Sequence, residues 1–472
     1  ERGAQPPSES ERGWGPASHE KEISMHKLLT ATVLAAAAAA VHAQTPRPPS
    51  TIAFLNVTVL PMDREAVLPE QHVLVRDGKI VEIGPAARVR LPAGAIQLDG
   101  AGKFLMPTLA EMHAHIPGGK EPDALVEKTL FLYAANGVGT IRGMLGDPRH
   151  LQYRERAGKG ELFSPRIYTS GPSLNGKTVP TAEAAAQAVV AQKAAGYDLL
   201  KIHPGVPRAA FDALDAKADE VGIPFAGHVP LDVGLQRALE AKYRSIDHLD
   251  GYVEALAREP QTSQFFGLNL VQQVDESKIP ALVEATKKAG VWQVPTQVLF
   301  DSLLSEDTPS EMAAWPEMRY MPPATLKNWI EQKTNMTTKF SAADRRRFLE
   351  LRRRILKALL DGGVDYALGS DAPQWWNVPG FSAHRELRSL VLAGFTRFQA
   401  LQSGTFAAAR YFGTEAETGS VATGKRADLL LLDANPLQDI ANSTRIAGVM
   451  IAGRWMGRSA IDERLEGLIE PR

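Results

Sequence analysis

Two histidines separated by one residue, His113 and His115, follow the apolar run 104–112. Successive side chains of a strand point to opposite faces, so residues i and i+2 share one face. Neutral imidazoles are common ligands of zinc and similar divalent metals. The spacing therefore predicts a buried strand that ends in two metal ligands, although an isolated pair of this kind also occurs in ordinary surface loops.

Lys201 lies in a second apolar run, residues 198–203, on the same face as His203. Burial disfavours the charged form of a lysine, and a neutral amine reacts with carbon dioxide to give a carbamate that bridges two metals. The same amine could instead form a Schiff base with a carbonyl substrate. The structural alternative is a lysine whose ammonium group reaches solvent at a strand end.

Three further polar residues end short apolar runs: His228 after Ala226-Gly227, His248 after Ile246-Asp247, and Asp371 after Gly369-Ser370. Each histidine alone is more often a satisfied core or surface residue than a ligand. Asp371 alone could cap a helix or sit in a turn. Their shared position at the ends of apolar runs favours one common site.

Recurring short strands and intervening helices would position these residues. Eight strands are expected, at residues 104–112, 138–142, 167–170, 199–203, 225–229, 245–249, 291–299 and 366–370. Helices are expected between them, for example at 181–195, 207–221 and 343–360. This alternation predicts an α/β protein, a (β/α)8 TIM-type barrel over residues 104–415, in which the chemistry lies at the C-terminal strand ends.

Segments with β-type patterning flank the predicted barrel on both sides. The first set lies in residues 50–103 and contains the turn Asp77-Gly78, and the second lies in residues 416–460 and contains four consecutive leucines, 429–432. We expect the two sets to pair into one small β-sandwich domain.

The N-terminal residues have the features of a leader and a secretory signal. Residues 1–24 are polar without apolar periodicity, and we expect them to be non-native or untranslated. Residues 25–43 have a basic start, an apolar core and small residues before Gln44, as in a signal peptide cleaved after Ala43. The rival is a membrane-anchoring helix, but the apolar run is shorter than the roughly 20 residues a span requires. The mature protein is expected to be exported, to a bacterial periplasm.

Composition narrows the function classes. The 472 residues are 44% apolar and 23% charged, with a net charge of -1, so we expect a small-molecule substrate and neither nucleic acid nor, after signal cleavage, a membrane as partner. The chain has no cysteine, which excludes disulfides, thiolate metal sites and a cysteine nucleophile. Assembly into a homo-oligomer through outer helices stays open.

The combination of His113, His115, Lys201, His228, His248 and Asp371 resembles the amidohydrolase superfamily of metal-dependent hydrolases. The resemblance covers nearly the whole mature chain, including the terminal segment 424–432. In detail the chain is similar to the branch of imidazolonepropionase-like enzymes, prolidase-type dipeptidases and ochratoxinase. The motif set is specific to the superfamily and not to a substrate.

The resemblance implies two divalent metal ions, with zinc as the expected metal. His113, His115 and Asp371 would hold one metal, His228 and His248 the other, and carbamylated Lys201 would bridge both. Asp371 and His248 are the expected catalytic residues, with Asp371 taking and returning the proton. Superfamily members with one metal and an unmodified lysine also exist, and ligands of this type also accept manganese, cobalt or iron.

Weaker candidates surround this set. Arg142, His203 and Tyr252 could contact substrate, and Arg142 and Tyr252 could equally be structural partners. His384 could support the ligands or lie on a helix surface. The insertion 301–340 is a candidate lid or pocket wall, and the arginines at 345–347 and 352–354 are expected to be solvated.

These expectations favour a hydrolase that cleaves an amide or peptide C-N bond in dipeptides or N-acyl amino acids. A lactonase or esterase on the same scaffold is the alternative, because the same chemistry attacks either carbonyl. From other classes come a Schiff-base lyase built on Lys201 and a non-catalytic interaction protein on a decayed barrel. The lyase would leave the four histidines without a role, and a decayed barrel would be expected to lack ligands.

Overall fold

The computed structural model describes residues 51–259 and 262–471, all within the structural unit that spans residues 49–472. The expected leader and signal peptide lie outside the described residues. Within these ranges, no helix combines the length and the apolar character needed to cross a membrane.

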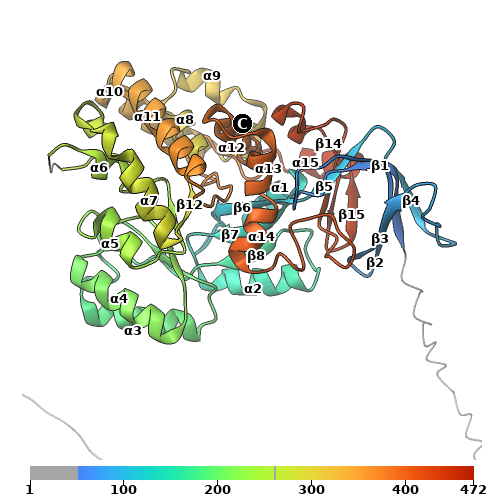
Figure 1. Cartoon of the computed structure of the whole chain (residues 1–472), viewed down its shortest axis with the longest axis horizontal. Helices are drawn as coiled ribbons and strands as arrows, with labels where there is room; N and C mark the ends of the chain where they lie inside the picture. Colours follow the sequence, from blue (N-terminus) through green and yellow to red (C-terminus); the bar gives the residue numbers. More distant parts are fainter. Residues whose placement is uncertain (1–50, 260–261, 472) are drawn as a thin grey trace, which may run out of the picture. The chain divides into compact units, whose positions relative to one another are not determined.

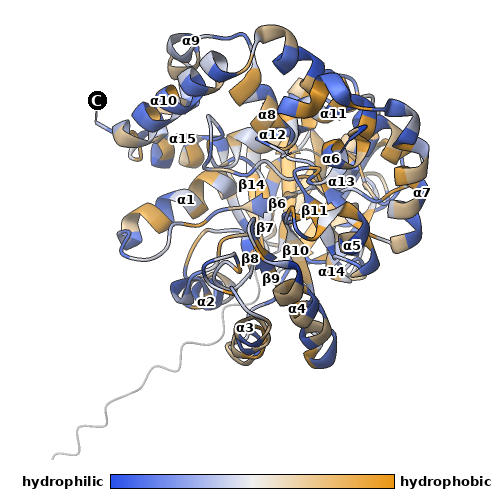
Figure 2. Cartoon of the chain, turned by 90° about the vertical axis from the view of Figure 1, so that its left-hand side faces the viewer, coloured by the Kyte–Doolittle hydropathy of each residue, from blue (hydrophilic) through white to orange (hydrophobic). Residues whose placement is uncertain are grey.

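Parallel strands form the centre of the larger part of the molecule (Figure 1). Seven strands pair in two groups, β6–β8 and β9–β12. They are β6 (Leu109–Ala114), β7 (Val138–Gly143), β8 (Arg166–Thr169), β9 (Leu200–Ile202), β10 (Phe225–Gly227), β11 (Ser245–Asp247) and β12 (Trp292–Val294). Apolar strands occupy the middle of the molecule and helices surround them (Figure 2).

Single parallel bridges connect these strands into a ring. Ser170 pairs with Leu199, Gln293 with Tyr366, and Ala114 with Ala372. The eighth position is therefore filled by the segment 366–372, which contributes bridges instead of the regular strand expected at 366–370. This order agrees with a (β/α)8 barrel, as predicted.

The seventh expected strand is shorter than the range 291–299. Regular pairing ends at Val294, and Thr296 turns the chain with a φ of 45° so that Gln297 begins helix α8. The helices expected at 181–195, 207–221 and 343–360 are present as α3 (Ala182–Ala194), α4 (Arg208–Val221) and α11 (Ala342–Asp361). Thr181 caps α3 by accepting a hydrogen bond from Ala184 N.

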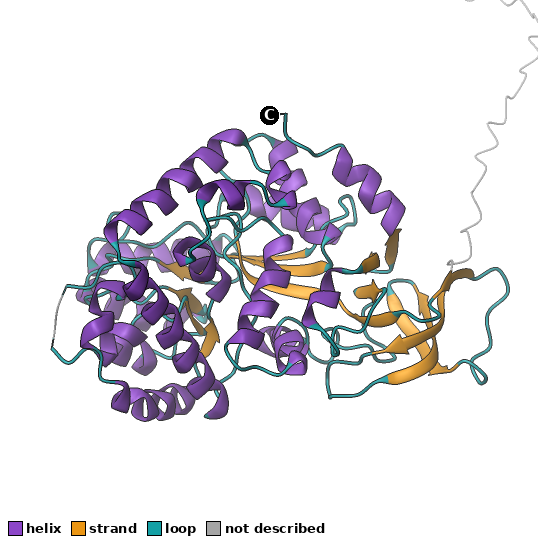
Figure 3. Cartoon of the chain, turned by 90° about the horizontal axis from the view of Figure 1, so that it is seen from above, coloured by secondary structure: helices purple, strands orange, loops and turns teal. Residues whose placement is uncertain are grey.

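Helices follow or connect the barrel strands, apart from α15, which follows the last strand of the terminal sheet (Figure 3). They are α1 (Asp123–Ala135), α2 (Pro148–Gly158), α3 (Ala182–Ala194), α4 (Arg208–Val221), α5 (Gly234–Glu240), α6 (Tyr252–Leu256), α7 (Ile279–Ala289), α8 (Gln297–Leu304), α9 (Pro309–Ala313), α10 (Pro323–Lys339), α11 (Ala342–Asp361), α12 (Phe381–Leu392), α13 (Arg397–Ser403), α14 (Phe406–Phe412) and α15 (Arg458–Glu466). Short 3-10 helices are η1 (Leu268–Gln273), η2 (Glu276–Lys278), η3 (Pro316–Tyr320) and η4 (Ile440–Thr444).

Strands from both ends of the described chain form a second, eight-stranded sheet, in the order β15-β14-β13-β5-β1-β2-β3 with β4 beside β1. They are β1 (Ile52–Val59), β2 (Leu68–Arg76), β3 (Lys79–Pro85), β4 (Ile96–Asp99), β5 (Phe104–Pro107), β13 (Leu429–Leu432), β14 (Ile446–Ile451) and β15 (Arg454–Gly457). Ile80 N donates to Lys425 O, so β3 meets the segment before β13. The sheet thereby folds over a core that includes Phe54, Val73, Leu105 and Leu431.

The first expected barrel strand, residues 104–112, is divided between the two sheets. β5 pairs with β1 and β13, whereas β6 pairs with β7. Thr108 is the single residue between them, and its N–H donates to Asp428 O. One extended segment therefore ties the terminal sheet directly to the strand that carries His113.

Candidate metal centre

The six expected metal ligands converge at the C-terminal ends of the barrel strands. His115 Nε2 lies 2.6 Å from Asp371 Oδ1, and Lys201 Nζ lies 3.3 Å from His113 Nε2. The ring of His248 lies 4.5 Å from that of His113. His228 completes the group, since its ring centroid is 4.6 Å from that of His248.

The donor set fits divalent metal ions. One ligand atom each from His113, His248 and Asp371 lies within 4.8 Å of the others, and all three side chains are buried. Buried imidazole and carboxylate groups that converge in this way are typical of a metal site. His115 and Lys201 border this cluster through the contacts given above, so a second ion could be held next to the first.

His113, His228 and His248 are held neutral, as metal ligands must be. Burial, together with the charge of Lys201, lowers the pKa of His113 well below its usual value. Burial and the neighbouring His113 do the same to the pKa of His248, and burial lowers the pKa of His228 to about 3. Each ring therefore offers an unprotonated nitrogen at neutral pH.

Lys201 is fully buried, and desolvation lowers its pKa to about 8. Its side chain runs past Gly227, where a Cβ atom would lie 2.8 Å from Lys201 Cδ and 2.5 Å from Ile202 O. Only glycine leaves this space, and its φ of 121° is also one that other residues rarely adopt. The solvent-reaching alternative for Lys201 is therefore wrong, and the lysine has the environment that a reactive amine requires.

Residues behind the ligands contact the ring nitrogens, through hydrogen bonds at His228 and His248, and sequence reasoning missed them. Asp247 Oδ2 lies 2.8 Å from His113 Nδ1, Asp250 Oδ2 lies 2.7 Å from His228 Nδ1, and Thr296 Oγ1 lies 2.8 Å from His248 Nδ1. Such partners orient a ligand and raise its basicity. Asp247 and Asp250 flank His248 in the sequence, which was an available signal, whereas Thr296 had none.

Glu111 joins the first and last barrel segments behind the ligands. It accepts hydrogen bonds from His113 N, Ser370 N and Ser370 Oγ. Burial raises its pKa to about 7. The carboxyl group thereby sets the spacing between His113 and Asp371, which follows Ser370.

Backbone strain concentrates around the site. His248, Thr296 and Asp371 have φ values of 63°, 45° and 62°. Non-glycine residues in this region cost on the order of 1–3 kcal/mol each and persist where the surrounding structure holds them, often at functional sites. Of these strained residues, His248 and Asp371 are expected metal ligands, and Thr296 contacts the ring of His248.

The three weaker substrate candidates differ in their placement. Arg142 is fully buried and donates to both carboxylate oxygens of Asp247, at 3.1 and 3.0 Å. Tyr252 is also fully buried, with its hydroxyl 2.7 Å from Thr286 Oγ1. These contacts match the structural alternative for both residues.

His203 faces the ligand cluster, with its ring 5.2 Å from that of His228. Ser173 Oγ lies 2.6 Å from His203 Nδ1 and holds the ring in place. Burial lowers the pKa of His203 to about 2, so the imidazole is neutral. Of the three weaker candidates, His203 keeps the position of a substrate contact.

Two expectations away from the ligands are wrong. His384 is buried, and its ring nitrogens bond to Ser443 Oγ and Asn136 O, so it lies neither on a helix surface nor against a ligand. Arg345 and Arg352, expected to be solvated, are both buried. Arg345 donates to Phe340 O, and Arg352 Nη1 donates to His248 O at 2.7 Å. An arginine on an outer helix thus reaches the backbone of a ligand.

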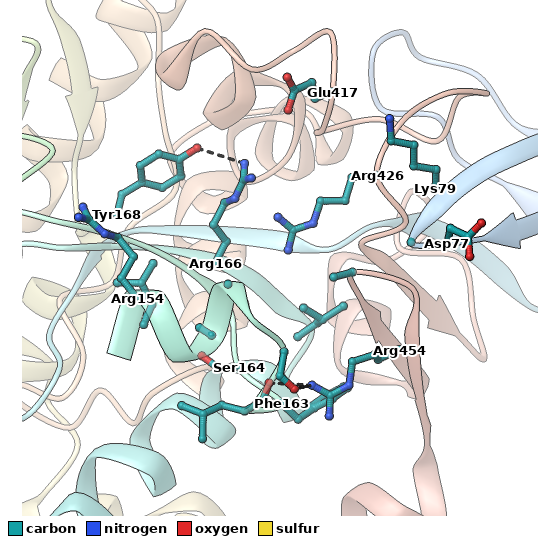
Figure 4. Close-up of a pocket in the computed structure, with 18 of the residues that line it drawn as sticks. Asp77, Lys79, Arg154, Phe163, Ser164, Arg166, Tyr168, Glu417, Arg426 and Arg454 are labelled. Atoms are coloured by element: carbon teal, nitrogen blue, oxygen red, sulfur yellow. Dashed lines mark hydrogen bonds between the residues drawn. The ribbon is translucent and has the colours of Figure 1, made fainter. Parts of the chain in front are cut away.

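A cavity of about 930 Å³ lies elsewhere, between the barrel and the terminal sheet (Figure 4). Its lining includes Arg166, the first residue of β8, and Arg426 and Arg454 from the terminal segment. Since the metal ligands follow the C-terminal strand ends, this cavity is at the opposite end of the barrel strands. It therefore does not serve the metal cluster.

The model of the Amidohydrolase family matches residues 104–456, most of the chain. The chain belongs to the amidohydrolase family. That match covers every barrel strand and all six expected ligands.

Curated relatives of this amidohydrolase are adenine deaminases. One, from Chelativorans sp. (strain BNC1), is 24% identical over 385 residues, which are 79% of this chain and 53% of that protein. Adenine deaminase 2 from Bradyrhizobium sp. (strain ORS 278) is 23% identical over 431 residues, 88% of this chain and 59% of that protein. The chain thus spans little more than half the length of these relatives.

Solved structures with the same fold include peptide-bond and amide hydrolases. A bottromycin amidohydrolase has a TM-score of 0.66 at 22% identity, covering 89% of this chain and 91% of that one. A Xaa-Pro dipeptidase with bound methionine has a TM-score of 0.64 at 18% identity, covering 86% and 100%. The A. niger ochratoxinase has a TM-score of 0.63 at 17% identity, covering 87% and 96%. These TM-scores show that the three proteins share their fold with this chain.

Proposed function

We propose that this amidohydrolase cleaves the amide or peptide C-N bond of a dipeptide or an N-acyl amino acid. The observation that carries the proposal is the convergence of four histidines, a buried lysine and a carboxylate at the C-terminal ends of the barrel strands. The expected ligand set is complete, which counts against a decayed barrel. A lyase that used Lys201 alone would give the histidines no task.

Two divalent metal ions, zinc in the first instance, would be held by His113, His115 and Asp371 and by His228 and His248, with carbamylated Lys201 between them. Bound metals at such a site lower the pKa of water and polarise the substrate carbonyl. The low pKa values of the ring nitrogens keep them available as ligands, and the space beside Gly227 admits the Lys201 side chain. This arrangement supports the binuclear form.

Asp371 would move the proton. Its Oδ1 lies 2.6 Å from His115 Nε2, and its backbone N–H donates to His113 O, so the carboxylate is held at the centre of the cluster. There it would accept the proton of the attacking water and deliver it to the leaving nitrogen. His203, fixed by Ser173, would contact the substrate beside His228.

The substrate class draws support from the fold neighbours, which include a dipeptidase and an amide hydrolase. The adenine deaminases favour a second candidate, deamination of a heterocyclic base. A lactone remains the alternative substrate on the same scaffold. We further propose export to a periplasm through the signal at residues 25–43, which appearance of the cleaved protein in a periplasmic fraction would test.

The decisive measurement is metal content per chain, by elemental analysis of protein grown and purified with bicarbonate. The proposal expects about two equivalents, with a loss in Lys201→Ala and none in Lys217→Ala, a control at an exposed lysine that pairs with Glu220. One equivalent unaffected at Lys201 would show the mononuclear form. No metal would overturn the mechanism.

Turnover of the metal-loaded enzyme then decides the substrate class. Dipeptides, N-acyl amino acids, a lactone panel and adenine are compared by kcat/KM at equal metal content. Hydrolysis of the amides above the other classes supports the proposal. Preference for adenine or for lactones would replace it with the corresponding alternative.

A further inference from the structure

A second hollow has a volume of about 550 Å³. It is bounded by helix α10 and by the loop that follows Asp371. The lining residues are Ala324, Thr325, Asn328, Trp329, Gln332, Pro373, Gln374 and Trp375. The loop is fixed to the cluster, since His115 N donates to Ala372 O.

Helix α10 belongs to the insertion 301–340, which the sequence marked as a candidate pocket wall. The helix packs against α8 and α9, next to α11 in the chain (Figure 1). Buried Lys333 anchors it by donating to Ser302 O and Ser305 O. The wall is therefore a helix held in place and not an open loop.

Aromatic rings connect this hollow to the metal ligands. Trp375 lies 5.6 Å from Phe265, and Phe265 lies 5.3 Å from Phe266. Phe266 in turn lies 5.8 Å from the ring of His248 and 6.1 Å from that of His228. Phe265, Phe266 and Trp375, here called the aromatic wall, thus run from the hollow to the ligands.

The backbone holds the aromatic wall in a strained arrangement. Phe265, Phe266 and Trp375 have φ values of 46°, 56° and 43°. Large aromatic residues rarely adopt this region, and its cost is met where the surrounding structure requires one side-chain direction. All three residues remain partly accessible to solvent, so part of their surface is free to contact a ligand.

The chemistry of the lining selects the ligand group. No lining residue of the hollow is charged, so the hollow offers no ion-pair partner to a charged group. Aromatic rings pair with other rings through offset or edge contacts. The amides of Asn328, Gln332 and Gln374 can meet neutral polar atoms at the edge of such a ring.

We propose that the hollow and the aromatic wall form a subsite for a neutral aromatic group on one side of the scissile bond, with Trp375 as the residue that determines this specificity. The inference rests on the proposed amide hydrolase function, because the ring must be joined to a bond that reaches the metal ligands. It narrows the substrate class to aromatic amides.

Matched substrate pairs test the subsite on each side of the bond. N-benzoylglycine is compared with N-acetylglycine, and N-acetylphenylalanine with N-acetylalanine, on the metal-loaded full chain. In one pair the aromatic member is expected to have a kcat/KM about tenfold or more above its partner, the selectivity that a filled apolar pocket provides. Ratios near one in both pairs, with turnover of the small amides, would overturn the inference and leave the proposed function standing.

Variants identify the residue responsible. Trp375→Ala should reduce the aromatic-to-small ratio toward one, mainly through KM for the aromatic member, and Trp375→Phe should restore part of it. Trp455→Ala removes a tryptophan of the terminal sheet, packed on Phe54, and should leave the ratio unchanged. An unchanged ratio in Trp375→Ala would refute the assignment.

Loss of the proposed function would be recognised separately. If no amide of the panel is hydrolysed, the amide hydrolase function fails, and calorimetry of N-benzoylglycine and N-acetylglycine binding then decides the subsite. Tighter binding of the benzoyl compound that is lost in Trp375→Ala supports it. Equal binding of both compounds overturns it.

Discussion

Arg352 is the perturbation that tests the site's architecture most directly. Its guanidinium donates to His248 O at 2.7 Å, to Pro295 O at 3.0 Å and to Gln297 Oε1 at 3.0 Å, and it lies 3.5 Å above the Phe300 ring. Through the carbonyl of His248 it stabilises the strained backbone of a ligand. We therefore expect Arg352→Met to weaken metal binding although the residue contacts no metal.

The magnitude follows from the three acceptors. Each buried acceptor left without its charged donor costs about 1–3 kcal/mol. Part of this is offset because the buried guanidinium is itself costly, as its pKa of about 9 indicates. A net loss of about 3–5 kcal/mol of stability is expected, and metal affinity should fall about 10- to 100-fold, as for other partners of ligands.

Chelator competition measures the affinity, and circular dichroism shows that the fold is retained. Arg352→Lys keeps the charge but cannot reach three acceptors, so it should lie between the wild type and Arg352→Met. Arg354→Met is the matched control, because Arg354 is on the same helix but partly exposed and paired with Glu276. Wild-type metal affinity in folded Arg352→Met would refute the reasoning.

Three further outcomes are expected. Asp371→Asn should lower kcat about 10²- to 10⁴-fold, because it removes the proton acceptor. The control is Asp361→Asn, at a helix end where Asp361 pairs with Lys357, and it should leave kcat unchanged. A kcat of Asp371→Asn within a few fold of wild type would exclude Asp371 as the proton carrier. Removing the metal with a chelator should lower the midpoint of thermal unfolding, and adding the metal back should restore the midpoint. The reason is that a metal concentration of 1,000 times Kd adds about 4 kcal/mol to the free energy of unfolding. Identical melting curves with and without metal would count against a metal centre in the folded chain. Burial lowers the pKa of His384 to about 4, so this histidine is neutral in the folded protein. As the pH falls from about 6.5 towards 4, the unfolded chain binds the proton first, and the wild type loses stability. His384→Gln lacks this loss, and its deficit in free energy of unfolding should shrink by about 2 kcal/mol between pH 7 and pH 5; a deficit independent of pH would mean that the His384 pKa is not depressed.

The ligands could be placed from the sequence because each follows a short apolar run. An apolar run followed by a polar residue marks a strand end, and a barrel brings all its strand ends to one face. His228, His248 and Asp371 were located in this way without any knowledge of the loops between them. The alternation of strands and helices was a local signal of the same kind.

Residues that act through long-range contacts could not be placed. Thr296 meets His248 only because the chain turns after Val294, and nothing in the local sequence required that turn. Arg352 was assigned to solvent because arginine clusters on outer helices usually face water. Its burial depends on the carbonyl groups of residues 57 and 104 positions away.

The segment 366–370 was expected to form a regular eighth strand, and there is a physical reason why it does not. Asp371 and the residues after it turn out of the extended conformation, so the segment can form bridges at Tyr366 and Ala372 but no continuous ladder. The first strand was read as one element because its apolar run is unbroken. Only the pairing partners, β13 on one side of Thr108 and β7 on the other, reveal the division.

That division has a consequence for biosynthesis. β5 lies between β1, made shortly before it, and β13, which leaves the ribosome some 320 residues later. Until then, one edge of the strand that leads to His113 has no partner, and the first metal ligands have no firm support on that side. A nascent chain or a truncated product that ends before Leu429 would therefore be expected to expose this edge to chaperones and proteases, and metal loading would come after translation instead of during it.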